Sequence, residues 1–406
     1  MSFQQGLSGL NAAARNLDAI GNNVANANTV GFKSAGLIFA DVFAASMGAT
    51  AGNSVGIGTA VAAVQTHFSQ GNIRTTSNPL DIAINGNGFF RMDTNGAVSY
   101  TRAGQFHLDR DGYIVAPNGG KLTGYGVDAT GNILIANPGP LQMSSAQLPA
   151  TATTSGEIGL NLDARDPVVT VTPFNPTNSA TYNKATSLTI YDSLGNSHSL
   201  STYYAKTAPN TWSVYAALDG TALPASVGTL NFNPNGTLNT TTTTLPFNLS
   251  LTIGGGAATP LAMTLDYTNT TQFGSGFSVD TLSQDGFAAG QLAGYAIDES
   301  GIVVGRYSNG QTRSMGQIVL ASFKNPAGLE PLGNNGYAET TESGQAIPGV
   351  PGSSNMGLVQ SGAVEESNVD LTRELVDMIT AQRVYQANAQ TIKTQDQVLN
   401  TLVNLR

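Results

Sequence analysis

The sequence predicts an α+β multidomain protein in which α-helical, coiled-coil-forming termini enclose two nested, mostly antiparallel all-β domains. Three observations support this. Apolar residues recur at alternating spacings of four and three at both chain ends, whereas apolar and polar residues alternate through long internal segments. The composition also shifts toward Thr, Ser, Asn and Pro after about residue 145 and back after about 284. A domain inserted into another domain explains that order, because the ends of a domain often lie close together.

Each terminal helix carries one narrow apolar stripe. The N-terminal stripe is Phe3, Leu7, Leu10, Ala14, Leu17, Gly21 and Val24. The C-terminal stripe is Leu371, Leu375, Met378, Gln382, Tyr385, Ala389, Ile392, Asp396, Leu399 and Val403. Such spacing suits a coiled-coil seam, so we predict that both stripes are assembly seams between copies of the chain. The alternative is that the helices pack only on their own domain.

The segments between the helices follow in order. Residues 1–27 are the N-terminal helix, and 28–70 are an extended, partly irregular connector rich in Gly, Ala, Ser and Asn. A loop of that length is unusual inside a compact domain, so we expect it to lie along neighbouring subunits and to act as a hinge. The first β domain is discontinuous, with residues 71–144 and 285–357. The inserted outer β domain is 145–284, and 358–406 hold the C-terminal connector and helix.

Turn chemistry identifies the β domains. Asp is followed three residues later by Gly at 93–96, 109–112, 128–131, 192–195 and 298–301. Asp favours the first position of a type I turn and Gly the last, so these segments predict β-hairpins rather than calcium loops, which need more spaced ligands. Before the last helix we expect Asn368 to be the N-cap, and Glu365 and Glu366 to place favourable charge near the N-terminus of that helix.

Composition excludes several classes of protein. Charged residues are 11% of the chain, its net charge is −9, and it lacks a basic stripe, so we expect no nucleic-acid partner. There are no cysteines, and the three histidines are scattered. We therefore predict no catalytic, cofactor-binding or metal-binding residue, and no enzyme activity. No apolar run is long enough for membrane insertion, and no cleaved signal peptide is recognisable. A secreted hydrolase lacks any motif in its favour, whereas a carbohydrate-binding adhesin remains an alternative.

Several motifs, in one order along the chain, resemble those of bacterial flagellar rod and hook proteins, an axial protein family. They lie at residues 10–14, 22–34, 81–90, 100–106, 111–112, 122–125, 366–371, 374–376 and 381–385. Together they span roughly the first 125 and last 50 residues, and long motifs in a fixed order are specific. The motif residues expected to matter in the connector and first β domain are Asn22, Asn23, Asn26, Gly31, Phe32, Lys33, Gly86, Gly88, Phe89, Phe90, Gly104, Phe106, Gly124 and Tyr125.

The resemblance implies a structural role. Because of its large insertion, the chain is similar to hook members of the family, with a distal rod or other axial protein as the alternative. It implies a homopolymer of many copies whose terminal helices form an inner tube, making a flexible curved universal joint that passes motor torque to the filament. It also implies an extracellular flagellar location. The implied partners are a hook cap, the distal rod, hook–filament junction proteins and the type III export apparatus.

Overall fold

The computed structural model describes residues 2–42, 56, 58–353 and 355–404. The chain divides into two compact units. Unit 1 contains residues 1–145, 294–306 and 312–406, and unit 2 contains 146–293 and 307–311. Within the described ranges, neither unit has a helix that is both long and apolar enough to cross a membrane.

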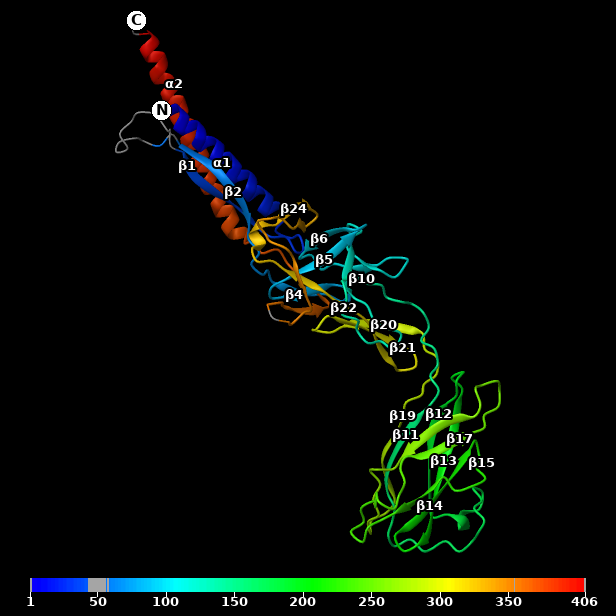
Figure 1. Ribbon diagram of the computed structural model, residues 1–406. Coiled ribbons are helices and arrows are strands. Elements are labelled where there is room, and N and C mark those ends of the chain that lie inside the picture. The colour runs from blue at the N-terminus through cyan, green and yellow to red at the C-terminus, as the bar shows by residue number, and fades with distance from the viewer. Residues whose placement is uncertain (1, 43–55, 57, 354, 405–406) are drawn as a thin grey trace. The chain divides into compact units, whose positions relative to one another are not determined.

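Unit 1 begins and ends with a long helix. Helix α1 (Ser2–Ala25) and helix α2 (Leu371–Asn404) lie side by side in Figure 1. Antiparallel sheets are formed by the residues between them. The predicted fold class is therefore confirmed. The N-cap of α2 is Asp370, whose Oδ1 accepts hydrogen bonds from the backbone N–H groups of Thr372 and Arg373. The prediction that Asn368 is the cap was wrong, because its side chain is bonded elsewhere.

The segment expected to be an irregular connector contains a pair of strands. Strands β1 (Ala35–Val42) and β2 (Gly58–Thr66) pair antiparallel, with an irregularity between Ile38 and Phe39. Both strands contact α1. Pairing satisfies the backbone groups that an isolated extended chain would leave to water. Most of residues 43–57, which join the two strands, lie outside the described residues.

The rest of unit 1 is a β body. Its largest sheet has the strand order β20-β21-β22-β9-β5-β6-β25-β24, and β7, β8, β10, β23 and β26 pair beside that path. The bounds of these strands are β5 Phe89–Thr94, β6 Ala97–Thr101, β7 His107–Leu108, β8 Ile114–Val115, β9 Lys121–Tyr125, β10 Gly139–Pro140, β20 Leu292–Ile297, β21 Ile302–Tyr307, β22 Thr312–Ile318, β23 Leu320–Ser322, β24 Glu330–Gly333, β25 Gly336–Ala338 and β26 Ile347–Gly349. A short 3₁₀ helix, η2 (Pro326–Gly328), precedes β24.

Two small strand pairs connect the body to the C-terminal segment. Strand β27 (Leu358–Ser361) pairs with β4 (Ile82–Asn85), and β28 (Ala363–Glu365) pairs with β3 (Ile73–Thr75). Residues 358–365, expected to be connector, thus belong to the β structure of unit 1. The body's core is apolar and includes Ile82, Phe90, Leu122 and Ile318, none of which is exposed.

The predicted Asp-x-x-Gly turns are confirmed by backbone hydrogen bonds. At 109–112, 128–131, 192–195 and 298–301, the Gly N–H donates to the Asp carbonyl three residues earlier. Each of these glycines has positive φ, which residues with a Cβ rarely adopt. In the turn at 93–96, the Gly96 N–H donates to the Asp93 side chain instead.

Unit 2 is a β-sandwich. One sheet has the order β17-β18-β11-β19, with β11 and β18 parallel; the other has the order β12-β13-β14-β15, with β16 also on β14. The strand bounds are β11 Ser155–Asn161, β12 Lys184–Tyr191, β13 Ser197–Ala208, β14 Thr211–Leu218, β15 Thr221–Ala222, β16 Gly228–Asn231, β17 Phe247–Leu251, β18 Leu261–Asp266 and β19 Ser278–Gln284, with the 3₁₀ helix η1 at Ser179–Thr181. Alternate residues of both sheets form one core around Trp212, whose Nε1 donates to Gln272 Oε1 at 3.0 Å.

Candidate assembly surface

The two helices of unit 1 pair in opposite directions. A Cβ added at Gly6 would lie 3.1 Å from Ile392 Cγ1, and one added at Gly9 would lie 2.8 Å from Asn388 Oδ1. Farther along α1, Asn23 Nδ2 donates to Glu374 Oε1 at 3.1 Å. The residue numbers of the contacting positions therefore decrease along α2 as they increase along α1. The pair is antiparallel, and glycines allow the close approach of the helices at one end.

The face that α1 turns toward α2 is not the predicted seam. Ala12, Ala13 and Ile20 are buried in the same part of α1, and they line a groove of about 960 Å³ between α1, β1 and α2. The seam residues lie around the helix from that face. Phe3 and Leu7 are exposed, and the remaining apolar members of the seam are half-buried: Leu10, Ala14, Leu17 and Val24.

Helix α2 leaves even more apolar surface uncovered. Its seam residues Leu371, Leu375, Tyr385 and Leu399 are exposed, Leu375 by 48%. Met378, Ala389 and Ile392 are half-buried, Gln382 is exposed, and the Val403 side chain lies outside the described residues. Among the described side chains of this 34-residue helix, Ala381 alone is buried.

Sequence reasoning missed a second exposed apolar set on α2. Val376 is 59% exposed, and Ile379, Val384 and Val398 are also exposed. These residues fall outside the heptad stripe, so a search for one narrow seam passes over them. Each of them is next in sequence to a stripe residue, so the apolar face of α2 is wider than the two positions per heptad of a narrow seam. Contiguous apolar surface of this kind marks an interaction site in a folded protein.

The Asn residues of the family motif at the end of α1 have different surroundings. Asn23 is buried, and its side chain exchanges two hydrogen bonds with the backbone of Ala35, at 2.9 and 3.0 Å. This side chain therefore joins the last turn of α1 to the first residue of β1. Asn26 Nδ2 donates to Asn22 Oδ1 at 2.8 Å at the surface, which closes the end of the helix locally.

Most other motif residues shape or fill the β body. Gly31 has φ +72°, and a Cβ there would overlap the backbone at Ala103. The same overlap would occur between a Cβ at Gly104 and the Ile82 carbonyl, and between one at Gly124 and the Gln317 carbonyl. Gly86 and Gly88 both have positive φ. The aromatic motif residues Phe89, Phe90 and Phe106 are buried, whereas Phe32 and Tyr125 are half-buried.

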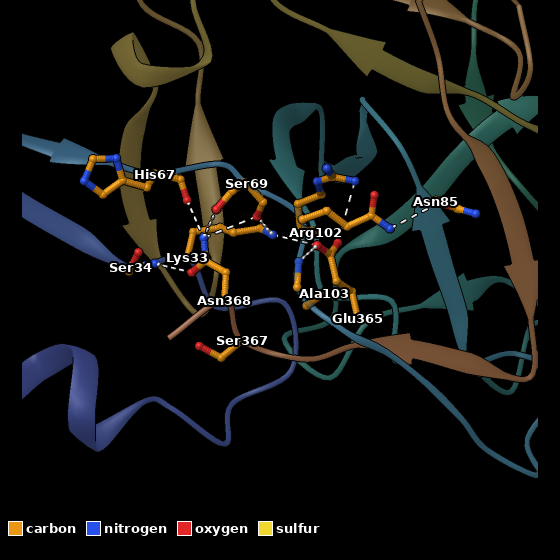
Figure 2. A network of polar contacts seen from close by, with 12 residues as sticks. Lys33, Ser34, His67, Ser69, Asn85, Arg102, Ala103, Glu365, Ser367 and Asn368 are labelled. Carbon is orange, nitrogen blue, oxygen red and sulfur yellow. Dashed lines mark hydrogen bonds and ion pairs between the residues drawn. The ribbon is translucent and has the colours of Figure 1, made fainter. Parts of the chain in front are cut away.

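The structure also brings two charged motif residues, Lys33 and Arg102, together with Glu365, which directly precedes the motif at 366–371. Lys33 follows α1, Arg102 follows β6, and Glu365 ends β28; all three side chains are buried and close together (Figure 2). The expected role of Glu365 at the N-terminus of the last helix was wrong, since the residue is buried in a strand before that helix. Sequence reasoning could not find this cluster because Lys33 and Glu365 are 332 positions apart.

Comparisons with known proteins match the chain along most of its length. Four family profiles match it: "Flagella basal body rod protein" at 3–33, "Flagellar hook protein FlgE/F/G D1 domain" at 83–161, "Flagellar basal body protein FlaE D2 domain" at 161–287, and "Flagellar basal body rod FlgEFG protein C-terminal" at 360–405. The third of these falls in the β-sandwich of unit 2.

Full-length relatives agree with the profiles. The chain is 45% identical to the flagellar hook protein FlgE of Escherichia coli and 46% identical to that of Salmonella typhimurium, over 100% of both chains in each case. It is 36% identical to the hook protein of Rhizobium meliloti, over 100% of this chain and 98% of that one. The crystal structure of Helicobacter pylori flagellar hook protein FlgE2 has a similar fold, with a TM-score of 0.54 at 14% identity, covering 71% of this chain and 99% of that chain.

The chain thus combines exposed helical termini, a β body built on the motif glycines, and an inserted sandwich. It aligns end to end with hook proteins. It is a structural, non-enzymatic subunit of the extracellular flagellar hook, and it polymerises within the flagellar structure. The chain belongs to the flagellar hook protein FlgE family.

Proposed function

We propose that the apolar stripes of α1 and α2, whose described residues are exposed or half-buried in the single chain, are the seams through which copies of this chain form the hook tube. The observation that carries this proposal is the exposure of Leu371, Leu375, Tyr385 and Leu399 on α2. Fully burying a large apolar side chain contributes about 1.5–3 kcal/mol. Several such residues on each subunit supply a strong driving force for association. Seam burial between subunits is therefore the main source of polymer stability.

The pairing of α1 with α2 in one chain supports this assignment. It uses the glycine and alanine face of α1 and, on α2, the seam residue Ile392. The exposed seam residues Leu371, Leu375, Tyr385 and Leu399 stay free for other copies. Long helices with so little buried surface are marginal in water by themselves. Assembly of the helices into the inner tube therefore stabilises them, and unassembled subunits keep their seams weakly ordered. The β-rich units form the outer layers of the tube, and the polymer acts as a flexible universal joint between motor and filament.

The finer partners follow from membership of the hook family. The tube joins the distal rod at its base and the hook–filament junction proteins at its tip, and a hook cap guides growth. The type III export apparatus delivers the subunit as an unfolded chain. The absence of cysteine from the sequence suits that route, because no disulfide can lock a compact structure before export.

The test is a pair of charge substitutions on α2. Leu375→Asp places a carboxylate on the proposed seam, where burial without a partner opposes association. Gln390→Asp adds the same carboxylate at an exposed position off the stripe. We expect Leu375→Asp to abolish hook polymers in electron micrographs, while circular dichroism still shows folded β structure. Gln390→Asp should polymerise like the unchanged protein. Hooks of normal length from Leu375→Asp would refute the seam.

A further inference from the structure

The segments that join α1 and α2 to the β body are residues 28–37 and 366–370, here called the helix roots. They meet at one buried ionic cluster in unit 1. Lys33 Nζ lies 2.6 Å from Glu365 Oε1, and Arg102 Nη1 lies 3.6 Å from Glu365 Oε2. The Lys33 and Glu365 side chains are fully buried, and that of Arg102 is 3% exposed. Figure 2 shows the three side chains converging from separate segments. The cluster therefore joins the chain just after α1, the end of β6 and the strand that leads toward α2.

The same side chains also hold backbone groups of neighbouring segments. Lys33 Nζ donates to the Ser69 carbonyl at 2.7 Å, and the Gly71 N–H donates to Glu365 Oε1 at 2.9 Å. Arg102 Nη2 donates to the Gly86 carbonyl at 2.8 Å. The cluster thus ties the segment after β2 and the turn after β4 to the two helix roots.

Asn368 completes the arrangement beside the cluster. Its Oδ1 accepts from the Ser34 N–H at 2.8 Å, and its Nδ2 donates to the His67 carbonyl at 2.8 Å and to Ser69 Oγ at 2.9 Å. One side chain therefore links the segment before β1, the segment after β2 and the segment before α2. These contacts are visible in Figure 2.

Energetics indicate that the cluster sets geometry more than it adds net stability. Burial lowers the pKa of the Lys33 ammonium, and the nearby Glu365 carboxylate opposes that shift. Burial also lowers the pKa of the Arg102 guanidinium, and the Glu365 carboxylate again opposes that shift. Desolvation of buried charges often cancels their attraction, so apolar residues of similar volume would be about as stabilising. What apolar residues cannot do is hold the carbonyls of Ser69 and Gly86.

We propose that Lys33, Arg102, Glu365 and Asn368 form a latch that fixes the roots of α1 and α2 to the β body of unit 1. The latch makes the helix pair and the β body turn as one element, so torque passes through the subunit without loss at residues 28–37 and 366–370. This replaces the expectation that the connector is a hinge. The torque-bearing role rests on the proposed function in the hook, whereas the latch itself is a property of one subunit.

The first experiment measures amide hydrogen exchange in the full-length monomer. Glu365→Gln removes the carboxylate and leaves two buried cations unpaired. We expect exchange to rise about tenfold or more at residues 31–36, 67–71 and 365–369, with unit 2 unchanged. The matched control is Glu366→Gln, because the neighbouring Glu366 pairs with Arg74 at 2.9 Å on the surface. That variant should exchange like the unchanged protein, since exposed ion pairs contribute little. Equal exchange in the two variants would overturn the latch.

A triple variant separates geometry from stability. Lys33→Met, Arg102→Met and Glu365→Leu together replace the charges with apolar side chains of similar size. Compared with Glu365→Gln, we expect the thermal unfolding midpoint of unit 1 to return toward that of the unchanged protein. Amide exchange at the helix roots should nevertheless stay as fast as in Glu365→Gln. Recovery of slow exchange as well would overturn the proposal, because packing alone would then suffice.

The torque-bearing role is tested in assembled hooks. Glu365→Gln keeps the seams, so it should polymerise, and beads attached to its hooks should show larger angular fluctuations than beads on Glu366→Gln hooks. Equal fluctuations alongside faster root exchange would refute this role of the latch. Failure of the seam proposal gives a different result, since Leu375→Asp would then polymerise normally whatever the exchange data show.

Discussion

Helix α2 and the unit 2 sandwich differ in how they treat apolar side chains. The sandwich buries Trp212, Tyr204 and Tyr267 completely between its sheets. In α2, Leu375, Val376 and Ile379 are about half exposed. A region that satisfies its own apolar residues can fold as a unit, whereas one that exposes them depends on partners. The comparison indicates that the hook subunit separates folding from assembly, with folding in the β units and assembly in the helices.

The largest expected effect comes from disrupting the core of the unit 2 sandwich, the region that buries its own apolar residues. Trp212→Ala removes a fully buried ring and leaves Gln272 without its indole donor. We expect unit 2 to lose about 3–5 kcal/mol. In calorimetry of the full-length monomer, its transition should fall by roughly 10 °C. The transition of unit 1 should stay in place.

A neighbouring substitution controls for the effect of changing β14 itself. Ser213→Ala alters the next residue, whose side chain is half-buried on the opposite face of the strand. Its effect should be within about 0.5 kcal/mol. If both transitions moved together in Trp212→Ala, the two units would not fold independently, and the separation of folding from assembly would be wrong.

Much of this division was predictable from the sequence because it depends on local pattern. The spacing of Leu371, Leu375 and Met378 identified the long helix, and Asp-x-x-Gly segments identified hairpins in both units. A change in composition near residue 145 predicted an inserted domain, and unit 2 begins at residue 146. Such signals depend on residues a few positions apart, so no knowledge of the tertiary structure was needed.

The rest depends on contacts that local pattern does not encode. Nothing in the heptad spacing of α1 shows that Gly6 and Gly9, rather than the apolar stripe, face α2. The cluster of Lys33 and Glu365 joins residues at opposite ends of the chain. In the sequence, Lys33 is an ordinary charged motif residue, and Glu365 is an acidic residue just before a motif. Strands β1 and β2 are similarly hidden, because their pairing is not marked by a short turn.

An intermediate effect sharpens the boundary between the helices and the β body. Asn23→Ala removes both hydrogen bonds to the Ala35 backbone and one to Glu374. Each net hydrogen bond contributes about 1 kcal/mol, and Ala35 is partly accessible to water, so we expect a local loss of about 1–2 kcal/mol. Amide exchange at Ala35 should rise at least severalfold, with the β-sandwich unaffected.

The adjacent Asn22→Ala is the matched control for Asn23→Ala. Asn22 is exposed, and among the residues that the structure describes its side chain hydrogen-bonds only with Asn26. Its exchange pattern should match the unchanged protein. Equal changes in both variants would mean that the end of α1 frays as a whole and that Asn23 has no special linking role.

The smallest expected effect concerns pH and lies within unit 2. His198 Nδ1 lies 2.7 Å from Asp219 Oδ2, and its Nε2 lies 3.4 Å from Asp192 Oδ2. The hydrogen bond with Asp219 is the main cause that raises the pKa of His198 above its ordinary value. Burial alone would raise the pKa of Asp192, but hydrogen bonds from Asn196, Leu194 and His198 lower it to about 2.

The raised His198 pKa fixes the sign of the pH dependence. Its stabilising contribution is fully present below the unfolded pKa of about 6.5, and it is lost as pH rises through the raised folded pKa. We expect unit 2 to lose up to about 1 kcal/mol across that window. Fluorescence of Trp212, the only tryptophan in the sequence, reports unfolding of this unit directly. His198→Gln should remove the slope, whereas His107→Gln in unit 1 should keep it. A slope that survives in His198→Gln would show that another group, and not His198, titrates in this pH window.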